Sequence, residues 1–589
     1  MTSHDITPGS GNDDAVPGRF RLSSGMVTAL VVLAVALIHI IALIGNRGPV
    51  LYSDALGYLG NARFLAGGAA PTFDGSFAYA AGYSLLLVPI YWVTERSETV
   101  WAIAVALNVA LSVLIMLPAS WLGRHLFGLG RRPALLVAAV VSLTPALILQ
   151  PGRLWTEALF PVMFLTATAF ILAMFRTNRS LFALAAGGFV GYLVFIHGRG
   201  MAVAAAFVVV IMIAAATRRL AVLPMIVGAL STTVVIVADL AMRSYLSDRL
   251  WSAASTSANA GSASRILAAF SPSELGDTLS TALGHLWYVA AVSFGLAVVG
   301  VVALVWLVGR FEPFSNSSDG VRLTALFALI AVAGVAALSA GLLSEVNRVD
   351  HRVYGRYLEG VSPILILAGV AWLLRARTVW RVWAVGAAAI PVGGLLLVAW
   401  RGSEQFVGNV QKLSIPGLLG LQTIVDPTAD VFLDGLNIVA ISFVSAGVGL
   451  AIALYARHRA AAAVIAVVVV TVAFTFVGKA TSWDPFVSFW FDAYDDVPSA
   501  LSELPEDEPV AYDLRFLDPD ARNLYEFRLA PDLLVFVEDP CDPSAGRVLI
   551  SSDDAGAIGI DAMLGTADAV PRQGLWFLDE STVASCAWP

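Results

Sequence analysis

Three polar side chains near the N-terminus have the spacing of one helix face. They lie in the stretch SDALGYLGNARFLAGG, between two apolar segments. Asp54, Tyr58 and Asn61 stand at i, i+4 and i+7, so a helix would place them together. Ser53 could cap that helix and Gly67 could end it. Asp54 could then serve as a general base or metal ligand. Alternatively, it is an acid favoured in the first turn by the helix dipole.

Three other short polar segments, QPGRLWTE, HGRG and DHRVYGRYLE, also interrupt the apolar sequence. An arginine drawn into the membrane costs free energy, which favours a functional role for such a residue. Arginine can also hold phosphate oxygens with two parallel hydrogen bonds. The candidate side chains in these segments are Arg153, Glu157, His197, Arg199, Arg352, Arg356 and Tyr357. Arg63, at the end of the first stretch, is a further candidate.

Each of these segments also has a simpler interpretation. Glu157 could be only an acid at a helix start. Arg199 could extend to the lipid headgroups, and the arginines and tyrosines of 350–359 could form a headgroup-contacting edge. Asp239 and Arg243 are four residues apart and are best explained as a local ion pair.

The elements that must position these residues are apolar helices. The chain has 589 residues, of which 58% are hydrophobic and 13% are charged, and its mean hydropathy is +0.79. A soluble fold could not bury so many apolar helices, so we predict an all-α polytopic membrane domain. The thirteen candidate spans are 25–45, 100–122, 134–149, 158–175, 181–196, 201–216, 220–242, 286–309, 322–343, 359–374, 380–399, 434–455 and 459–477.

Loop charges indicate how the spans are oriented. Residues 81–93 cover roughly 20 Å as a helix, less than the hydrocarbon core, so we expect a surface-lying or re-entrant segment. Six arginine-containing loops then share one side: 124–132, 176–179, 217–219, 310–322, 375–381 and 456–459. The positive-inside rule assigns that side to the cytoplasm. All the candidate residues then lie in the opposite loops, on the outer face of the cytoplasmic membrane.

The two ends of the chain differ from its middle. Residues 1–24 are polar and predicted to be a disordered cytoplasmic tail, and residues 25–478 form the membrane domain. Residues 479–589 contain 22 acidic and 6 basic residues, a net charge of −16, whereas the remainder carries +8. Short strand-like runs between Pro, Asp and Gly turns predict a small extracytoplasmic α/β domain there. Its two cysteines, Cys541 and Cys586, could form a disulfide outside the cytoplasm.

The outer face therefore combines a carboxylate helix, a second acid and several arginines. This set suits transfer of a group from a lipid-linked phosphate: Asp54 would take a proton from an acceptor hydroxyl, and the arginines would stabilise the departing phosphate. A metal could share that second role.

These residues resemble the GT-C superfamily of membrane glycosyltransferases, which includes protein mannosyltransferases, aminoarabinose transferases and actinobacterial mannosyl- and arabinofuranosyltransferases. The stretch around Asp54 resembles the family's first outer loop, where an acid is the catalytic base. GYSLLLVPIYW resembles its second juxtamembrane helix. GRHLFG (123–128) and PGRLWTEALF resemble the end of the second span and the second outer-loop acid, and GRYLEGVSP (355–363) resembles an element near the lipid phosphate.

The resemblance implies a polyprenyl-phosphate sugar donor, an inverting reaction, and a glycan, lipid or protein acceptor in the cell envelope. It implies no nucleic-acid partner. The first loop has one acid rather than a pair, and no DxD motif stands in the second loop. We therefore expect no required cofactor and assign no metal ligand, although a divalent metal at the carboxylates is left open.

Two other function classes compete with this interpretation. A lipid or glycan flippase would favour ionisable residues in mid-span and paired broken repeats. A polymer ligase of the envelope would rely on outer-loop arginine and histidine without an acidic base. A nonenzymatic scaffold would leave the outer polar residues without a role. Asp54 separates these alternatives, because only the transferase needs its carboxylate.

Overall fold

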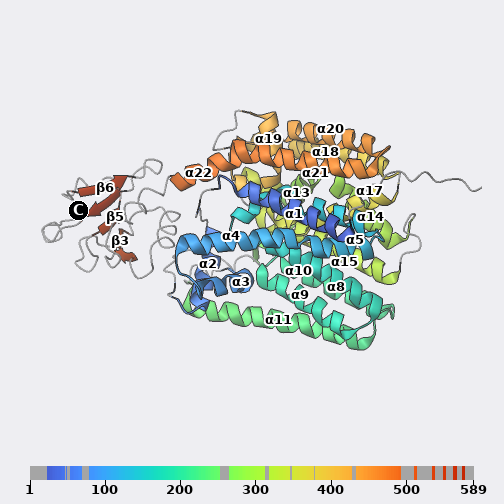
Figure 1. Cartoon of the computed structure of the whole chain (residues 1–589), viewed down its shortest axis with the longest axis horizontal. Coiled ribbons are helices and arrows are strands. Elements are labelled where there is room, and N and C mark those ends of the chain that lie inside the picture. The colour runs from blue at the N-terminus through green and yellow to red at the C-terminus, as the bar shows by residue number, and fades with distance from the viewer. Residues whose placement is uncertain are drawn as a thin grey trace, which may run out of the picture.

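The computed structural model describes residues 23–46, 48, 53–68, 70, 79–251, 264–311, 318–344, 348–376, 378–427 and 433–492, together with five strands near the C-terminus. The described part of the chain up to Asp492 is almost entirely helical (Figure 1). This confirms the predicted polytopic α-helical membrane fold.

The helices of the first half begin with α1 (Ser24–Leu43), the short α2 (Ser53–Leu65) and α3 (Ala81–Tyr91). They continue with α4 (Ser97–Leu114), α5 (Met116–His125), α6 (Arg131–Ser142), α7 (Pro145–Leu149), α8 (Leu159–Thr177), α9 (Ser180–Ile196), α10 (Gly200–Ala216) and α11 (Val222–Arg249). The predicted surface helix and the predicted short segment after it are therefore both present, as α2 and α3.

The second half contains α13 (Leu275–Val292), α14 (Leu296–Gly309), α15 (Asp319–Leu343), a 3-10 turn (Val349–Val353), the one-turn α16 (Arg356–Glu359), α17 (Pro363–Arg375) and α18 (Val379–Arg401). It ends with α19 (Leu419–Val425), α20 (Ile438–Ala456), α21 (Ala460–Gly478), a π-helical turn (Lys479–Trp483) and α22 (Asp484–Asp492).

Eight helices among the described residues are long and apolar enough to cross a membrane, and three bent helix pairs raise this number to as many as eleven. The 17-residue helices α9 and α10 correspond to the two remaining predicted spans.

Two spans predicted as continuous helices are instead bent pairs, and a third begins at a bend. Residues 134–149 belong to α6 and α7, which meet at 66°, and 286–309 belong to α13 and α14, at 106°. The predicted span 359–374 lies almost entirely in α17, which meets the preceding segment 349–359 at 68°. Proline follows two of the breaks, at Pro145 and Pro363, where the ring cannot continue a preceding helix. At the other break Phe294 and Gly295, between α13 and α14, have φ +52° and +85°, left-handed conformations that separate the two helices.

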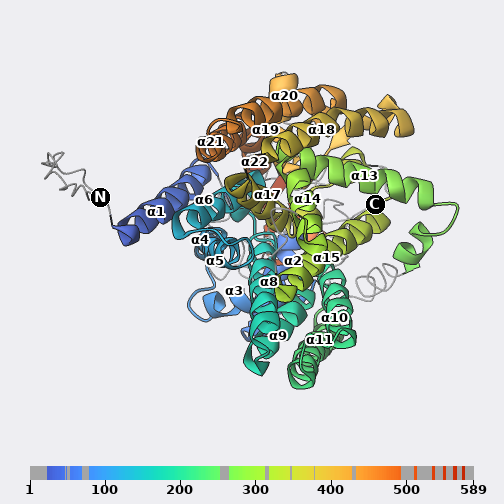
Figure 2. The same ribbon diagram turned by 90° about the vertical axis from the view of Figure 1, so that its right-hand side faces the viewer.

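The loops that the sequence places on one side of the membrane contact one another. Arg375 Nη1 donates to the carbonyl of Phe127 at 2.6 Å, and the Arg457 guanidinium lies 5.6 Å from the Trp380 ring. Arg219 pairs with Asp319, which joins loop 217–219 to loop 310–322. These contacts join basic loops at one end of the helices, where α5 and α17 finish in Figure 1. The start of α1 projects away from the other helices (Figure 2).

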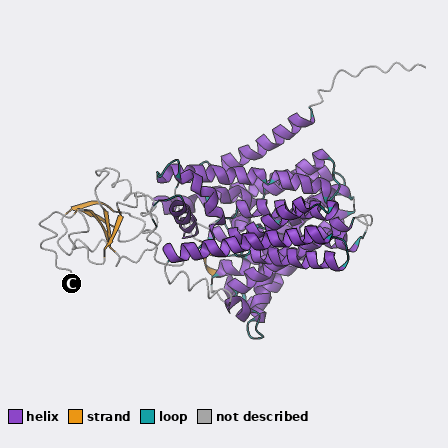
Figure 3. Ribbon diagram, turned by 90° about the horizontal axis from the view of Figure 1, so that it is seen from below, coloured by secondary structure: helices purple, strands orange, loops and turns teal. Residues whose placement is uncertain are grey.

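Near the C-terminus the described strands form a five-stranded sheet of order β4-β3-β5-β7-β6 (Figure 3). The strands are β3 (Val510–Asp513), β4 (Leu534–Val537), β5 (Val548–Ser551), β6 (Ala562–Thr566) and β7 (Gly574–Phe577). β3 pairs in parallel with β4 and β5, whereas β7 pairs antiparallel with β5 and β6. A separate small hairpin joins β1 (Val407–Val410) to β2 (Leu433–Gly435). Cys541 and Cys586 lie outside the described residues, so the disulfide stays a prediction.

Candidate active site

The helix that carries Asp54 lies where the predicted outer loops converge. α2 ends as the sequence indicates: Gly67 has φ +95°, and the Gly68 N–H donates to the carbonyl of Arg63 at 3.0 Å, closing the last turn. Tyr58 and Asn61 face inward and are buried, whereas the Asp54 side chain is 24% exposed. The helix therefore presents one carboxylate at the edge of a packed polar region.

Arg356 connects that carboxylate to the second acid. Its Nη2 donates to Asp54 Oδ2, and its Nε donates to Glu157 Oε1 at 2.9 Å. These contacts span 302 and 199 residues of the chain. The Arg356 guanidinium also lies 3.8 Å from the centre of the Trp155 ring, a cation–π contact. The side chains of Arg356 and Glu157 are only 12% and 3% exposed.

Arg199 completes the cluster from the tight turn between α9 and α10. Its Nη2 lies 3.5 Å from Glu157 Oε1, and its Nη1 donates to the carbonyl of Arg356 at 3.2 Å. Its guanidinium also lies over the Phe160 ring at 4.4 Å. The Arg199 Nε is buried and has no hydrogen-bond partner among the described residues. This leaves one buried N–H available to an incoming acceptor oxygen.

We call Asp54, Glu157, Arg199 and Arg356 the charge cluster. It contains two carboxylates and two guanidinium groups, so its formal charges cancel. Exposure falls from Asp54 through Arg356 to Glu157 and Arg199. A small molecule arriving from outside would therefore meet the carboxylate of Asp54 before it met the deepest arginine.

Three other predicted residues, His197, Tyr357 and Tyr58, border the charge cluster. The His197 ring packs edge-on against Tyr357 at 5.2 Å. Burial, with Arg199, Arg356 and Arg243 nearby, holds the pKa of His197 well below its usual range. Burial and the nearby Asp54 carboxylate raise the pKa of Tyr58 well above 10. Both side chains are therefore neutral at physiological pH.

Tyr79, which sequence reasoning missed, also contacts Asp54. Its hydroxyl donates to Asp54 Oδ1 at 2.7 Å, and its ring packs against Tyr58 with centroids 5.1 Å apart. Its carbonyl accepts from Asn61 Nδ2 at 3.0 Å, and Asn61 Oδ1 accepts from Trp251 Nε1 at 3.2 Å. Tyr79 precedes α3 in a stretch without helical or strand periodicity, so no pattern in the sequence points to it.

The structure places the other three predicted site residues elsewhere. The Arg352 guanidinium donates to Gln405 Oε1. Arg153 lies 5.1 Å from the Trp483 ring, and its carbonyl accepts from Asn108 Nδ2 at 2.7 Å. Arg63 contributes its carbonyl to the end of α2.

The carboxylates of the charge cluster are the groups that could hold a divalent metal. Among the described residues, no group of three or more His, Cys, Asp or Glu side chains converges. The guanidinium of Arg356 occupies the space between the Asp54 and Glu157 carboxylates, where a bridging cation would lie. The residues present therefore fit an arginine-bridged pair of acids better than a metal site.

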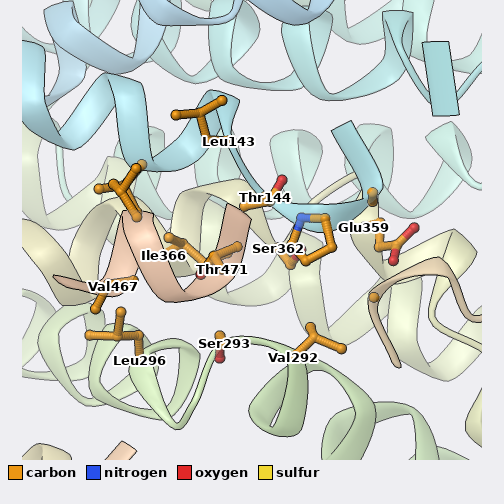
Figure 4. Close-up of a pocket in the computed structure, with 15 residues that line it drawn as sticks. Leu143, Thr144, Val292, Ser293, Leu296, Glu359, Ser362, Ile366, Val467 and Thr471 are labelled. Atoms are coloured by element: carbon orange, nitrogen blue, oxygen red, sulfur yellow. The ribbon is translucent and has the colours of Figure 1, made fainter. Parts of the chain in front are cut away.

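A cavity lies beside the charge cluster, one helical turn beyond Arg356. Figure 4 shows Glu359 at its edge, with Ser362, Thr144 and Ser293 among the lining residues. These last three residues mark the breaks of the three bent helix pairs, and most of the other lining residues are apolar. Glu359 Oε1 accepts from the Tyr288 hydroxyl. The helix breaks thus open an apolar space next to the arginines.

Comparison with known proteins identifies the fold. No family model matches the chain, and no curated protein matches it in sequence. The crystal structure of ArnT from Cupriavidus metallidurans bound to undecaprenyl phosphate matches with a TM-score of 0.54 and 16% identity, covering 96% of this chain and 100% of ArnT. The apo structure of the same protein gives a TM-score of 0.52 and 15% identity, with the same coverage. Arabinosyltransferase EmbB from Mycobacterium smegmatis matches over 80% of this chain and 43% of its own length, with a TM-score of 0.45 and 15% identity.

The match to ArnT extends over nearly the whole chain and confirms the predicted GT-C fold.

Proposed function

We propose that this protein is a membrane glycosyltransferase that moves a sugar from a polyprenyl-phosphate donor to a glycan, lipid or protein acceptor of the cell envelope. The observation that carries the proposal is the ion pair between Asp54 and Arg356, which joins a candidate base to a candidate phosphate ligand. The fold supports it, because ArnT has the same architecture and its crystal structure contains undecaprenyl phosphate.

In the proposed reaction, the acceptor hydroxyl oxygen forms a bond to the anomeric carbon of the sugar. The bond between that carbon and the phosphate oxygen breaks, and its electron pair leaves with the phosphate. The hydroxyl proton passes to Asp54 and then to water. Attack opposite the departing phosphate would invert the anomeric configuration. The products are a glycosylated acceptor and polyprenyl phosphate.

The arginines would supply the electrostatic part of this chemistry. Without a ligand, the formal charges of the charge cluster cancel. A bound phosphate would add negative charge, which the two guanidinium groups can stabilise. Arg199 offers its unpartnered Nε, and Arg356 offers a planar fork within reach of Asp54. Glu157 contacts both arginines and would hold them in place. Neutral His197 and Tyr357 would close the site beside them. No cofactor is required in this scheme.

The buried arginines meet the charge of a lipid phosphate, and Glu359, one turn beyond Arg356 in the chain, borders a small and mostly apolar cavity. A flippase would also need lipid contacts, but it would not need a carboxylate paired with the phosphate ligand.

The proposal is tested by incubating the purified protein with a panel of polyprenyl-phosphate sugars and envelope acceptors. Mass spectrometry should detect a glycosylated acceptor and released polyprenyl phosphate in equal amounts. Asp239→Asn is the matched control, because Asp239 is another buried acid paired with an arginine, Arg243 at 2.9 Å. Lipid movement across a vesicle membrane without any sugar transfer would support the flippase instead.

We also propose that the N-terminus is cytoplasmic and that residues 479–589 form an extracytoplasmic domain. Contacts that join three of the six basic loops, 124–132, 375–381 and 456–459, support a common side for these three. A reporter that is active only outside the cytoplasm, fused after Pro589, should be active. Activity of a cytoplasm-only reporter at that position would reverse the orientation.

A further inference from the structure

The two oxygens of Asp54 have different partners. Oδ1 accepts a hydrogen bond from the Tyr79 hydroxyl at 2.7 Å, whereas Oδ2 is paired with Arg356 Nη2. A carboxylate paired with a guanidinium is a poor proton acceptor, because gaining a proton cancels the ion pair. In this state the proposed base is therefore held by both oxygens and is not ready to act.

The two partners also differ in how firmly they are fixed. The Tyr79 backbone is tied to α2 through Asn61, and Asn61 is tied in turn to Trp251 at the end of α11. The Tyr79 ring lies against the buried ring of Tyr58. Asp54 and Asn61 belong to the same helix, α2. The Tyr79 hydroxyl therefore has a fixed position relative to Asp54.

Arg356, by contrast, is shared between two acidic side chains. Its guanidinium is divided between Asp54 and Glu157, with Nη2 3.5 Å from Glu157 Oε2 and bonded to Asp54 Oδ2. A phosphate oxygen is a third acceptor of the same chemical kind for a planar, bidentate donor. Turning towards a phosphate would break the contact with Asp54 while leaving the Nε contact with Glu157 as a pivot.

We propose that Tyr79 is a positioning residue that holds Asp54 through Oδ1, and that a bound donor phosphate draws Arg356 from Oδ2 so that Oδ2 becomes the basic oxygen. This inference rests on the proposed function. The acceptor proton passes to Oδ2 as the oxygen–sugar bond forms, and the electron pair of the broken bond leaves with the phosphate held by Arg356. The base thus becomes competent only when donor is present, which protects the empty site from activating water.

Tyr79→Phe removes only the hydroxyl and tests whether Tyr79 positions Asp54. Because a hydrogen bond to a charged group orients it strongly, kcat should fall about ten-fold while the donor KM changes less than two-fold. Tyr83→Phe is the matched control: the Tyr83 ring also packs against Tyr58, at 5.4 Å, but its hydroxyl donates to Asn108 at 2.8 Å. That variant should keep both constants within two-fold of wild type. If Tyr79 had only a structural role, Tyr79→Phe would change the donor KM as well as kcat.

A structure with polyprenyl phosphate bound tests the second part. It should show Arg356 on the phosphate, separated from Asp54 Oδ2, with Tyr79 still bonded to Oδ1. Arg356 still paired with Asp54 in the bound state, or an unchanged kcat in Tyr79→Phe, would overturn the inference. Neither result would affect the proposed function if Asp54→Asn is inactive, whereas a fully active Asp54→Asn enzyme would overturn the proposed function itself.

Discussion

Two arginine–carboxylate clusters lie at opposite ends of the helical domain. One is the charge cluster; the other surrounds Asp319, the first residue of α15, and comprises Arg219, Arg310 and Arg322. Both were foreseeable from arginine-containing loops. The side chains of the Asp319 cluster are 34% to 43% exposed, whereas three of the four residues of the charge cluster are nearly buried.

This difference in exposure distinguishes the two clusters by role. The charges of the Asp319 cluster help to orient the chain in the membrane, whereas those of the charge cluster can take part in catalysis. Exposed ion pairs contribute about 0–1 kcal/mol and are screened by salt. Buried charges must be paired, and breaking such a pair costs roughly 3–5 kcal/mol. The Asp319 cluster needs no explanation beyond the preference for arginine on one side of the membrane. The charge cluster is costly to maintain, which favours a functional role.

The largest effect should come from Arg356→Ala, compared with Arg322→Ala. Loss of Arg356 leaves Asp54 and Glu157 without their shared partner and removes a phosphate ligand. Turnover should fall by at least about 100-fold, and the free energy of unfolding by roughly 3–5 kcal/mol. Arg322→Ala should lower it by about 0–1 kcal/mol and leave turnover unchanged.

Polyprenyl phosphate binding and thermal unfolding of the purified variants check this pair. Arg356→Lys keeps the charge but lacks the planar fork, so it should fold while restoring binding only in part. Equal effects of Arg356→Ala and Arg322→Ala would remove the distinction between the two clusters.

Glu157→Gln against Asp319→Asn should give a smaller contrast. The glutamine keeps the size of Glu157 but holds the two arginines less firmly, so turnover should fall about ten-fold. Donor binding should be equal or tighter, because a negative charge that competes with phosphate is gone. Asp319→Asn should alter neither property. Steady-state kinetics with a binding assay would show this, and a loss of donor binding in Glu157→Gln would contradict the assignment.

His197 should make stability depend on pH. Its pKa in the folded protein lies well below the unfolded value of about 6.5. The unfolded state therefore binds more protons than the folded state as the pH falls below 6.5, and stability drops by up to about 1.4 kcal/mol per pH unit. Between pH 7.5 and 5.5, the unfolding midpoint should fall less in His197→Gln than in wild type. Equal shifts would show that His197 is not held neutral.

Chelation should have the smallest effect. Because Arg356 already bridges the two carboxylates, EDTA treatment should reduce turnover less than two-fold. Loss of activity with EDTA, restored by a divalent metal, would mean that the site rearranges around a cation. That result would also weaken the electrostatic role given to Arg356.

The sequence predicted the membrane fold and the four residues of the charge cluster. It could do so because charged groups stand out between apolar helices, and helix ends on one side must meet. It missed the bent pairs: Pro145 and Pro363 mark two of the breaks, but the break before Gly295 hardly changes hydrophobicity. It also missed Tyr79, which contacts Asp54 across 25 residues of chain without any periodic pattern. Arg352 was grouped with Arg356 because both stand in the outer-loop stretch DHRVYGRYLE, yet its guanidinium donates to Gln405.

The most direct test of the central claim measures turnover and polyprenyl phosphate binding on the same preparation of Asp54→Asn. The amide keeps the size of the side chain but cannot serve as the base. We predict that donor binding survives, because the arginines remain, and that turnover falls by about 10²–10⁴-fold, whereas Asp239→Asn retains both. A folded Asp54→Asn protein with normal donor binding and near-wild-type turnover would contradict the account.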